Sequence, residues 1–401
     1  MRSVIRRIAN DPVPVLLVLL MGITWTGLHL VTGIPFAGTS AYKSYTLQAM
    51  AWREGHTWVN NLSYLELAVY EGRYYVSFPP LPSVVLFPLT FLFGWDTPDN
   101  LLVKLYTCTA VLMMYRALNN LGENRIRAAA WAFLSAFASS LLPLTLEGAV
   151  WYHAQVLAYG LITASIYFLT ADRPAVSLLC YALSVACRPF DALYGILLIA
   201  VYSLICIREG KNVKYVIRRL RTGVIAGLCV AVMIGAYNAI RFGNPLEFGH
   251  NYLPEFSTQG GIQFSLAHVP KNAKVCFCGM PFSISDGKLS LNKFGFSVLI
   301  ACPAILFLFI RFMIDLFRKN VNTERAVLFA VFLVHLLLIL MHRTFGAYQF
   351  GARYCADLLP YAFFYRLIGK SDKPDPVTVG EWVWLIVIFG FTLYGSVAIT
   401  L

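Results

Sequence analysis

Long apolar runs separated by short basic segments constrain this chain more than any other feature of its sequence. The first run, from about Val13 to Val31, follows Arg2, Arg6 and Arg7 and has the length of a membrane-spanning helix. Similar runs recur to the C-terminus, and 58% of the 401 residues are hydrophobic whereas only 13% are charged. This composition is too apolar for a soluble protein of such length. The sequence therefore predicts an all-α, polytopic membrane protein.

The basic residues predict how the chain is oriented. The formal net charge is +12, and its basic residues lie in short segments between apolar runs, as the positive-inside rule predicts for cytoplasmic loops. Nucleic-acid binding would instead gather them on one soluble face, so no nucleic acid is expected as a partner. The segment 208–221 holds six basic residues and one acid. We expect this segment and the N-terminus on the cytoplasmic side of the plasma (inner) membrane.

Alternation of the apolar runs and charges predicts about 11 transmembrane helices in one integral membrane domain, residues 1–401, with the C-terminus outside. Two long outer loops are expected, at 33–98 and 241–296. The first contains an amphipathic stretch, 41–53, and an apolar piece, 81–95, that is too short to cross the bilayer comfortably and contains Pro82 and Pro88. We therefore predict interfacial or re-entrant helices in this loop.

The stretch from Tyr64 to Pro88 gathers groups that could perform chemistry. Glu66 could act as a catalytic base, because its apolar neighbours predict partial desolvation, which makes a carboxylate more basic. Arg73 could meet an anion, and the Pro79–Pro80 step cannot continue a helix, so it holds the chain extended. The alternatives are that this acid only caps or pairs with a surface helix, or that Asp96 or Asp191 reaches the same cavity.

Basic side chains in short outer turns are unexpected, because the positive-inside rule disfavours them there. An anion must compensate them, either acids across the same cavity or a phosphate-bearing ligand, and the sequence leaves both open. The candidate phosphate-binding residues are Arg188, Arg343, Arg353 and His342. The further candidates for substrate binding are Arg73, Tyr74, Tyr75, Asp191 and His250.

Together these features resemble the multi-spanning C class of glycosyltransferases (GT-C), whose relatives include protein O-mannosyltransferases and the aminoarabinose transferase of lipid A. The resemblance rests on the N-terminal span, the long outer loop with acids, the segment GRYYVSFPPLP at 72–82, and the later spans with arginine-containing outer turns. It covers the overall plan along most of the chain, whereas similarity of sequence is concentrated in the first 150 residues.

The resemblance implies a GT-C-like fold and inverting transfer of a sugar from a polyprenyl-phosphate donor. The acceptor would be a glycan, lipid or protein of the cell envelope at the outer face of the membrane. A carboxylate, here Glu66, would take the proton from the acceptor hydroxyl, and arginines would stabilise the departing lipid phosphate.

One place departs from the family pattern. Members commonly carry an Asp or Glu pair shortly after the first span, and the matching segment here, 38–42, contains no acid. Either Glu66 has taken over, or the chain lacks the usual chemistry. Some members use a divalent metal; the sequence has no clear metal cluster, so no metal site is predicted, and Mg²⁺ or Mn²⁺ stays open as a cofactor.

Two other function classes remain as alternatives. A transporter or flippase of lipid-linked saccharides would explain the spans and the outer basic residues, but transporters often show internal repeats and mid-span charges. We see no repeat between the two halves of the chain. A non-catalytic membrane assembly protein would explain the missing acid pair. The glycosyltransferase hypothesis ranks first.

Overall fold

The computed structural model describes residues 11–62, 65–257, 263–285, 287–369 and 374–401. Arg2, Arg6 and Arg7, which support the predicted orientation, and Tyr64 lie outside these residues. Among these described residues, six helices are long and apolar enough to cross a membrane, judged by length and composition. They are α2 (Val13–Thr32), α5 (Asp99–Asn120), η2 with α10 (Pro189–Arg208), α11 (Val213–Phe242), α16 (Thr323–Met341) and α18 (Val379–Thr400).

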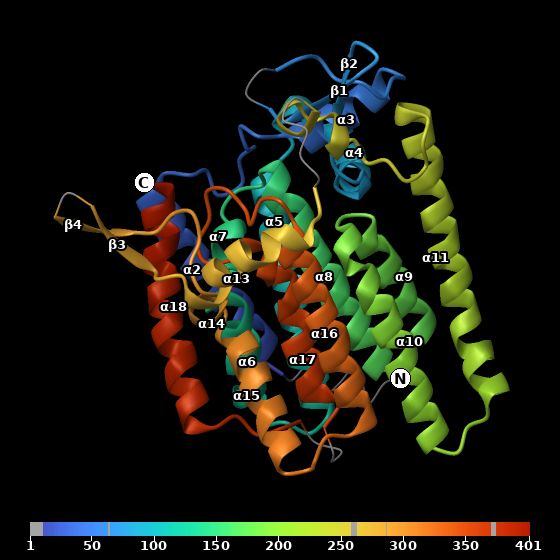
Figure 1. Cartoon of the computed structure of the whole chain (residues 1–401), viewed down its shortest axis with the longest axis vertical. Coiled ribbons are helices and arrows are strands. Elements are labelled where there is room, and N and C mark those ends of the chain that lie inside the picture. Colours follow the sequence, from blue (N-terminus) through green and yellow to red (C-terminus); the bar gives the residue numbers. More distant parts are fainter. Residues whose placement is uncertain (1–10, 63–64, 258–262, 286, 370–373) are drawn as a thin grey trace.

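Further helices complete the bundle, as Figure 1 shows. They are α6 (Arg125–Phe137), α7 (Leu141–Leu144), α8 (Val150–Thr170), α9 (Pro174–Val185), α15 (Pro303–Phe317) and α17 (Leu359–Leu367). Helix α8 packs between α5 and α9, and α9 in turn packs against α11. The predicted all-α polytopic membrane architecture is confirmed, whereas the count of about 11 spans stays a prediction.

The two ends of the bundle differ in their loops. We call the end where α10 stops and α11 and α16 begin the basic end, because it carries the segment 208–221. There, Nη1 of Arg208 lies 2.8 Å from Oε1 of Glu324, at the start of α16. We call the opposite end, where α8 begins and α16 stops, the cavity end.

The segment 33–98 lies above the bundle at the cavity end (Figure 1). It contains α3 (Ser44–Arg53), the antiparallel strands β1 (Leu67–Tyr70) and β2 (Arg73–Val76), α4 (Leu81–Phe93) and η1 (Gly94–Asp96). The strands were not predicted. They are joined by Glu71 and Gly72, whose φ angles of 47° and 74° suit the tight two-residue turn that matches the twist of a hairpin.

Helices α3 and α4 have the lengths expected of interfacial helices, but α3 is more enclosed than the sequence predicted. We expected it to lie on the membrane surface with one polar face. Most of its side chains are buried instead, because α3 packs against α4 and its Gln48 accepts a hydrogen bond from Ser83 at 2.7 Å. The polar face of α3 is therefore turned toward protein.

The segment 241–296 and the turns that follow complete the cavity end. It contains η3 (His250–Tyr252), α12 (Pro254–Ser257), η4 (Leu266–His268), α13 (Val269–Cys278), and the antiparallel strands β3 (Phe282–Ser285) and β4 (Lys288–Leu291). Next come α14 (Val298–Ala301) and, before α17, η5 (Arg353–Leu358). Helix α13 packs on α16, and the β3–β4 hairpin projects sideways from the bundle (Figure 1).

Candidate functional site

Two adjoining cavities lie at the cavity end. The smaller has a volume of about 510 Å³ and the larger of about 620 Å³. They share one wall, which is formed by Phe78, Trp151, His250, His342, Arg353 and Tyr354. A ligand bound across this wall would therefore reach both cavities.

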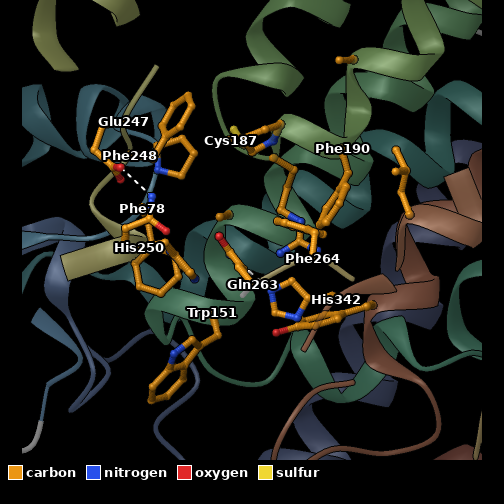
Figure 2. A pocket seen from close by; sticks show the side chains of 18 of the residues that line it. Phe78, Trp151, Cys187, Phe190, Glu247, Phe248, His250, Gln263, Phe264 and His342 are labelled. Atoms are coloured by element: carbon orange, nitrogen blue, oxygen red, sulfur yellow. Dashed lines mark hydrogen bonds between the residues drawn. The ribbon is translucent and has the colours of Figure 1, made fainter. Parts of the chain in front are cut away.

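The smaller cavity is mainly apolar. Ala192 and Leu193 of α10 and Leu338 of α16 line it from the bundle, and aromatic rings close it above. Figure 2 shows these rings together with His250 and His342, which approach the cavity from different sides. Because its walls continue the apolar surface of two spanning helices, the cavity suits an acyl or prenyl chain.

The larger cavity has a more polar lining. Glu66, Glu147 and Glu255 place three carboxylates in its wall, and the hydroxyl-bearing side chains of Tyr42 and Tyr152 lie among them. Such a lining suits a hydroxylated, water-soluble group. The two cavities thus differ in the chemistry that they can accept.

Arg188 lines the smaller cavity, but its charge is already compensated. Its Nε lies 3.1 Å from Oδ2 of Asp357, and a terminal nitrogen contacts the same oxygen. The other oxygen of Asp357 accepts a hydrogen bond from Gln155 at 2.7 Å. Of the two alternatives that the sequence left open, an acid across the cavity therefore applies to Arg188. Asp191 is 2% exposed and lines neither cavity.

Arg353 is in the opposite situation. Its side chain belongs to the shared wall, the residue is 6% exposed, and its guanidinium lies 5.4 Å and 5.2 Å from the ring centres of Tyr152 and Tyr354. Within the described parts of the chain, no carboxylate lies within ion-pair distance of it, and its Nε has no hydrogen-bond partner. Since an unpaired buried charge is costly, this position calls for an anion.

The two histidines of the shared wall are neutral at physiological pH. Burial lowers the pKa of His342 to about 4, and its Nδ1 lies 2.6 Å from the carbonyl oxygen of Thr344. Burial also lowers the pKa of His250, whose Nδ1 lies 2.8 Å from the carbonyl oxygen of Ser77. Because each Nδ1 donates to a carbonyl oxygen, each neutral ring leaves its Nε2 as a hydrogen-bond acceptor for a ligand and carries no positive charge.

Glu66, the predicted base, lines the larger cavity. Its carboxylate accepts a hydrogen bond from the indole nitrogen of Trp151 at 2.7 Å, and the residue is exposed. Arg343 lies over the ring of Phe256, 5.5 Å from its centre, and lines neither cavity itself.

Three residues predicted to bind substrate lie away from both cavities. Arg73 is exposed and lies 4.2 Å from the ring centre of Trp58, Tyr74 pairs with Val59, and Tyr75 packs on Phe242. The structure thus brings together five predicted residues, which are Glu66, Arg188, His250, His342 and Arg353. It leaves five outside these walls, which are Arg73, Tyr74, Tyr75, Asp191 and Arg343.

Glu147 is a carboxylate of the larger cavity that no sequence pattern indicated. Its Oε1 accepts a hydrogen bond from the hydroxyl of Ser40 at 2.6 Å. Ser40 lies in the segment where the family pattern has its acids. The two residues are 107 positions apart, so no local pattern joins them. The one sequence feature that could have indicated Glu147 is an acid followed by glycine at the end of an apolar run.

The start of α5 fixes both segments that meet at this contact. Asp99 accepts a hydrogen bond from the backbone N–H of Ser40 at 2.8 Å, and Asn100 accepts one from the N–H of Gly148 at 2.7 Å. A Cβ at position 148 would come within 2.6 Å of the Asp99 backbone, so glycine is needed for this close approach. The carboxylate of Glu147 is therefore positioned from both sides.

No group of three or more His, Cys, Asp or Glu side chains is placed to hold a metal ion in the part of the chain that the structure describes. The carboxylates of the larger cavity remain oxygen ligands of the kind that Mg²⁺ or Mn²⁺ would accept.

No protein-family model matches the sequence, and neither does any curated protein. Solved structures do match. ArnT from Cupriavidus metallidurans bound to undecaprenyl phosphate has a TM-score of 0.50 and 14% identity, covering 88% of this chain and 58% of that chain.

Two structures from Archaeoglobus fulgidus also match. The oligosaccharyltransferase in the apo form has a TM-score of 0.47 and 11% identity over 98% of this chain and 56% of that chain. The oligosaccharyltransferase AglB, in complex with an inhibitory peptide and a dolichol-phosphate, has a TM-score of 0.43 and 11% identity over 95% and 55%. This chain thus spans less than two thirds of each neighbour. The likeness to ArnT confirms the predicted GT-C-like fold.

Proposed function

We propose that this protein is a membrane glycosyltransferase that moves a sugar from a polyprenyl-phosphate donor to an acceptor hydroxyl with inversion of configuration. The observation that carries the proposal is Arg353, a buried guanidinium in the wall between an apolar and a polar cavity, without a carboxylate partner among the described residues. Its fold is that of ArnT, whose structure contains undecaprenyl phosphate.

The two cavities divide the donor between them. The prenyl chain would occupy the smaller cavity, between α10 and α16, and the phosphate would lie at Arg353. The planar guanidinium can give two parallel hydrogen bonds to phosphate oxygens. The same contacts would stabilise the charge that builds up on the phosphate as it leaves.

The sugar would then extend into the larger cavity, where the acceptor hydroxyl attacks its anomeric carbon. The new bond joins that carbon to the acceptor oxygen, and the bond to the phosphate oxygen breaks. A carboxylate must remove the hydroxyl proton. Glu66 is the base that the sequence predicts, and Glu147 is a second carboxylate of the same cavity.

Of these two, we propose Glu147 as the stronger candidate. The hydrogen bond from Ser40 and the anchors at Asp99 and Asn100 hold its carboxylate in one place, whereas Glu66 is an exposed residue. A base that is already positioned loses little entropy in the transition state. In this interpretation a serine occupies the usual position of the acid, and the carboxylate comes from a later loop.

The finer assignments follow the sequence predictions. The acceptor would be a glycan, lipid or protein at the outer face of the plasma (inner) membrane, with the basic end in the cytoplasm. Cysteine labelling from outside should modify positions in 64–80 and 251–296, and modification within 208–221 would contradict this orientation.

The decisive experiment uses purified protein in liposomes with undecaprenyl-phosphate-linked hexoses and pentoses, supplied with Mg²⁺, with Mn²⁺ or with a chelator. Mass spectrometry measures the release of undecaprenyl phosphate. We expect release with at least one donor, and loss of release in the Arg353→Met variant. A flippase would move the intact donor to the other leaflet without cleaving it. Absence of both cleavage and undecaprenyl-phosphate binding would reject the proposal.

A further inference from the structure

The β3–β4 hairpin has one apolar and one polar face. Its register pairs Phe282 with Leu291 and Ile284 with Leu289. Paired residues, and residues two apart on one strand, point to the same side of a sheet, so these four side chains share one face. Ser283, Ser290 and Lys288 belong to the opposite face.

The apolar face is covered only near the base of the hairpin, as far as the structure describes the surrounding chain. There, Leu291 is 6% exposed, and the ring of Phe282 lies 5.7 Å from that of Phe391 and 6.2 Å from that of Tyr394, both on α18. Toward the tip, Ile284 is 76% and Leu289 67% exposed. A two-stranded hairpin is marginally stable in water unless such a face packs against something.

We propose that this hairpin lies on the bilayer, with its apolar face in the boundary between headgroups and acyl chains. The face continues the surface of α18, a helix that is apolar enough to span the membrane. Figure 1 shows the hairpin leaving the bundle sideways, beside the half of α18 that ends at the cavity end. A hairpin that leaves the bundle sideways beside this part of α18 would lie along the membrane surface.

The hairpin belongs in the interface and not in the hydrocarbon core. The outer edges of two strands carry backbone groups without partners, which the hydrocarbon region does not tolerate but hydrated headgroups satisfy. Lys288 lies on the polar face and is exposed, and Lys293 follows β4. Both can meet lipid phosphates, since lysines near an anionic membrane surface are attracted to it.

The membrane contact is linked to the rim of the larger cavity. Directly after the hairpin, Nζ of Lys293 lies 5.3 Å from the ring centre of Tyr348, and Phe294 forms a backbone bridge to Gln349. Tyr348 and Gln349 line the larger cavity. The hairpin therefore ties the loop before Arg353 to the bilayer surface.

Fluorescence quenching in liposomes tests this placement. The variants Ile284→Cys and Leu289→Cys, in a background in which the exposed Cys229 and Cys278 are replaced by serine, would carry a polarity-sensitive dye. We expect lipids with brominated acyl chains to quench both dyes strongly and iodide to quench them weakly. Val69→Cys, on the β1–β2 hairpin, is the matched control, and its dye should show the reverse order.

Other results would overturn the proposal. Strong quenching of the dye at 284 by iodide, without quenching by brominated lipid, would place the face in water. Protection from both quenchers, together with crosslinking between copies, would mean that a second molecule covers it. Lys288→Glu should reduce brominated-lipid quenching in phosphatidylglycerol liposomes but not in phosphatidylcholine, and an equal response in both would exclude the role of the lysine. None of these readouts depends on glycosyl transfer.

Discussion

Both ends of the helix bundle bury arginines, but their partners differ. At the basic end Arg311, Arg325 and Arg366 pair with acids, whereas at the cavity end Arg353 has no acid partner among the described residues. At the basic end, Arg325 is 2% exposed and forms ion pairs with Asp315 and Asp375. At the cavity end, Arg353 is 6% exposed and has tyrosine rings beside it, with no carboxylate within ion-pair distance in the described residues. Residue type and burial are nearly the same.

In the proposed function, the partner of a buried arginine, and not its burial, separates a structural from a ligand-binding position. Arg311 with Glu381 and Arg366 with Glu123 repeat the paired arrangement at the basic end. A paired arginine holds helices together and has little capacity left for a ligand. An unpaired one adds nothing to stability until an anion arrives.

The largest expected effect is on stability and comes from breaking a pair at the basic end. Arg325→Met leaves Asp315 and Asp375 without their shared partner, and breaking a buried pair in this way costs about 3–5 kcal/mol. Arg353→Met removes an uncompensated charge and should leave stability unchanged or raise it. Thermal unfolding in detergent measures both. Equal losses of stability in the two variants would contradict the distinction between paired and unpaired buried arginines.

The next effect concerns the base. Glu147→Gln keeps the shape of the side chain but removes the proton acceptor, so turnover should fall on the order of 10²-fold, with undecaprenyl-phosphate binding retained. Glu54→Gln, an exposed acid of the outer segment 33–98, is the control. A drop in turnover for Glu66→Gln and not for Glu147→Gln would return the role to the predicted residue. Ser40→Asp added to Glu147→Gln should restore part of the activity, because it supplies a carboxylate across the same contact.

A smaller effect separates the arginines within the cavity end. Arg353→Lys keeps the charge but loses the planar fork, so the affinity for undecaprenyl phosphate should fall about tenfold, as for one lost charge-assisted hydrogen bond. Arg188→Lys and Arg343→Lys should change affinity less, since Arg188 is paired with Asp357 and Arg343 lines neither cavity. Unchanged binding in all three variants would give these arginines structural roles.

The smallest effect is a pH dependence of stability. Burial lowers the pKa of His342 to about 4, whereas in the unfolded chain it titrates near 6.5. Between these values only the unfolded chain gains the proton, so the free energy of unfolding decreases as the pH falls. Between pH 7 and pH 6 the decrease from this group is below about 1 kcal/mol. His342→Gln should make thermal unfolding less sensitive to pH in this range, and an unchanged slope would contradict the assignment.

Both β-hairpins have local sequence features that the prediction of helices does not take into account. The stretch 282–291, FSISDGKLSL, alternates apolar and polar residues around an Asp-Gly step, which is a strong hairpin signal. Likewise, Glu71 and Gly72 separate two short runs of apolar and aromatic residues, LAVY and RYYV. Because apolar helical runs dominate the chain, the sequence analysis predicts loops where these short strands lie.

The sequence by itself determined the membrane class, the helical architecture and the side of the bundle that carries the candidate site. Each of these follows from local composition, because a spanning helix satisfies its own backbone hydrogen bonds and needs only a sufficient apolar length. Only the tertiary structure decided which charges meet. The contact of Ser40 with Glu147, the pairing of Arg188 with Asp357 and the lack of a carboxylate partner for Arg353 among the described residues join or separate positions far apart in the chain. Electrostatic energy depends on distance in space, which apolar periodicity along the chain does not encode.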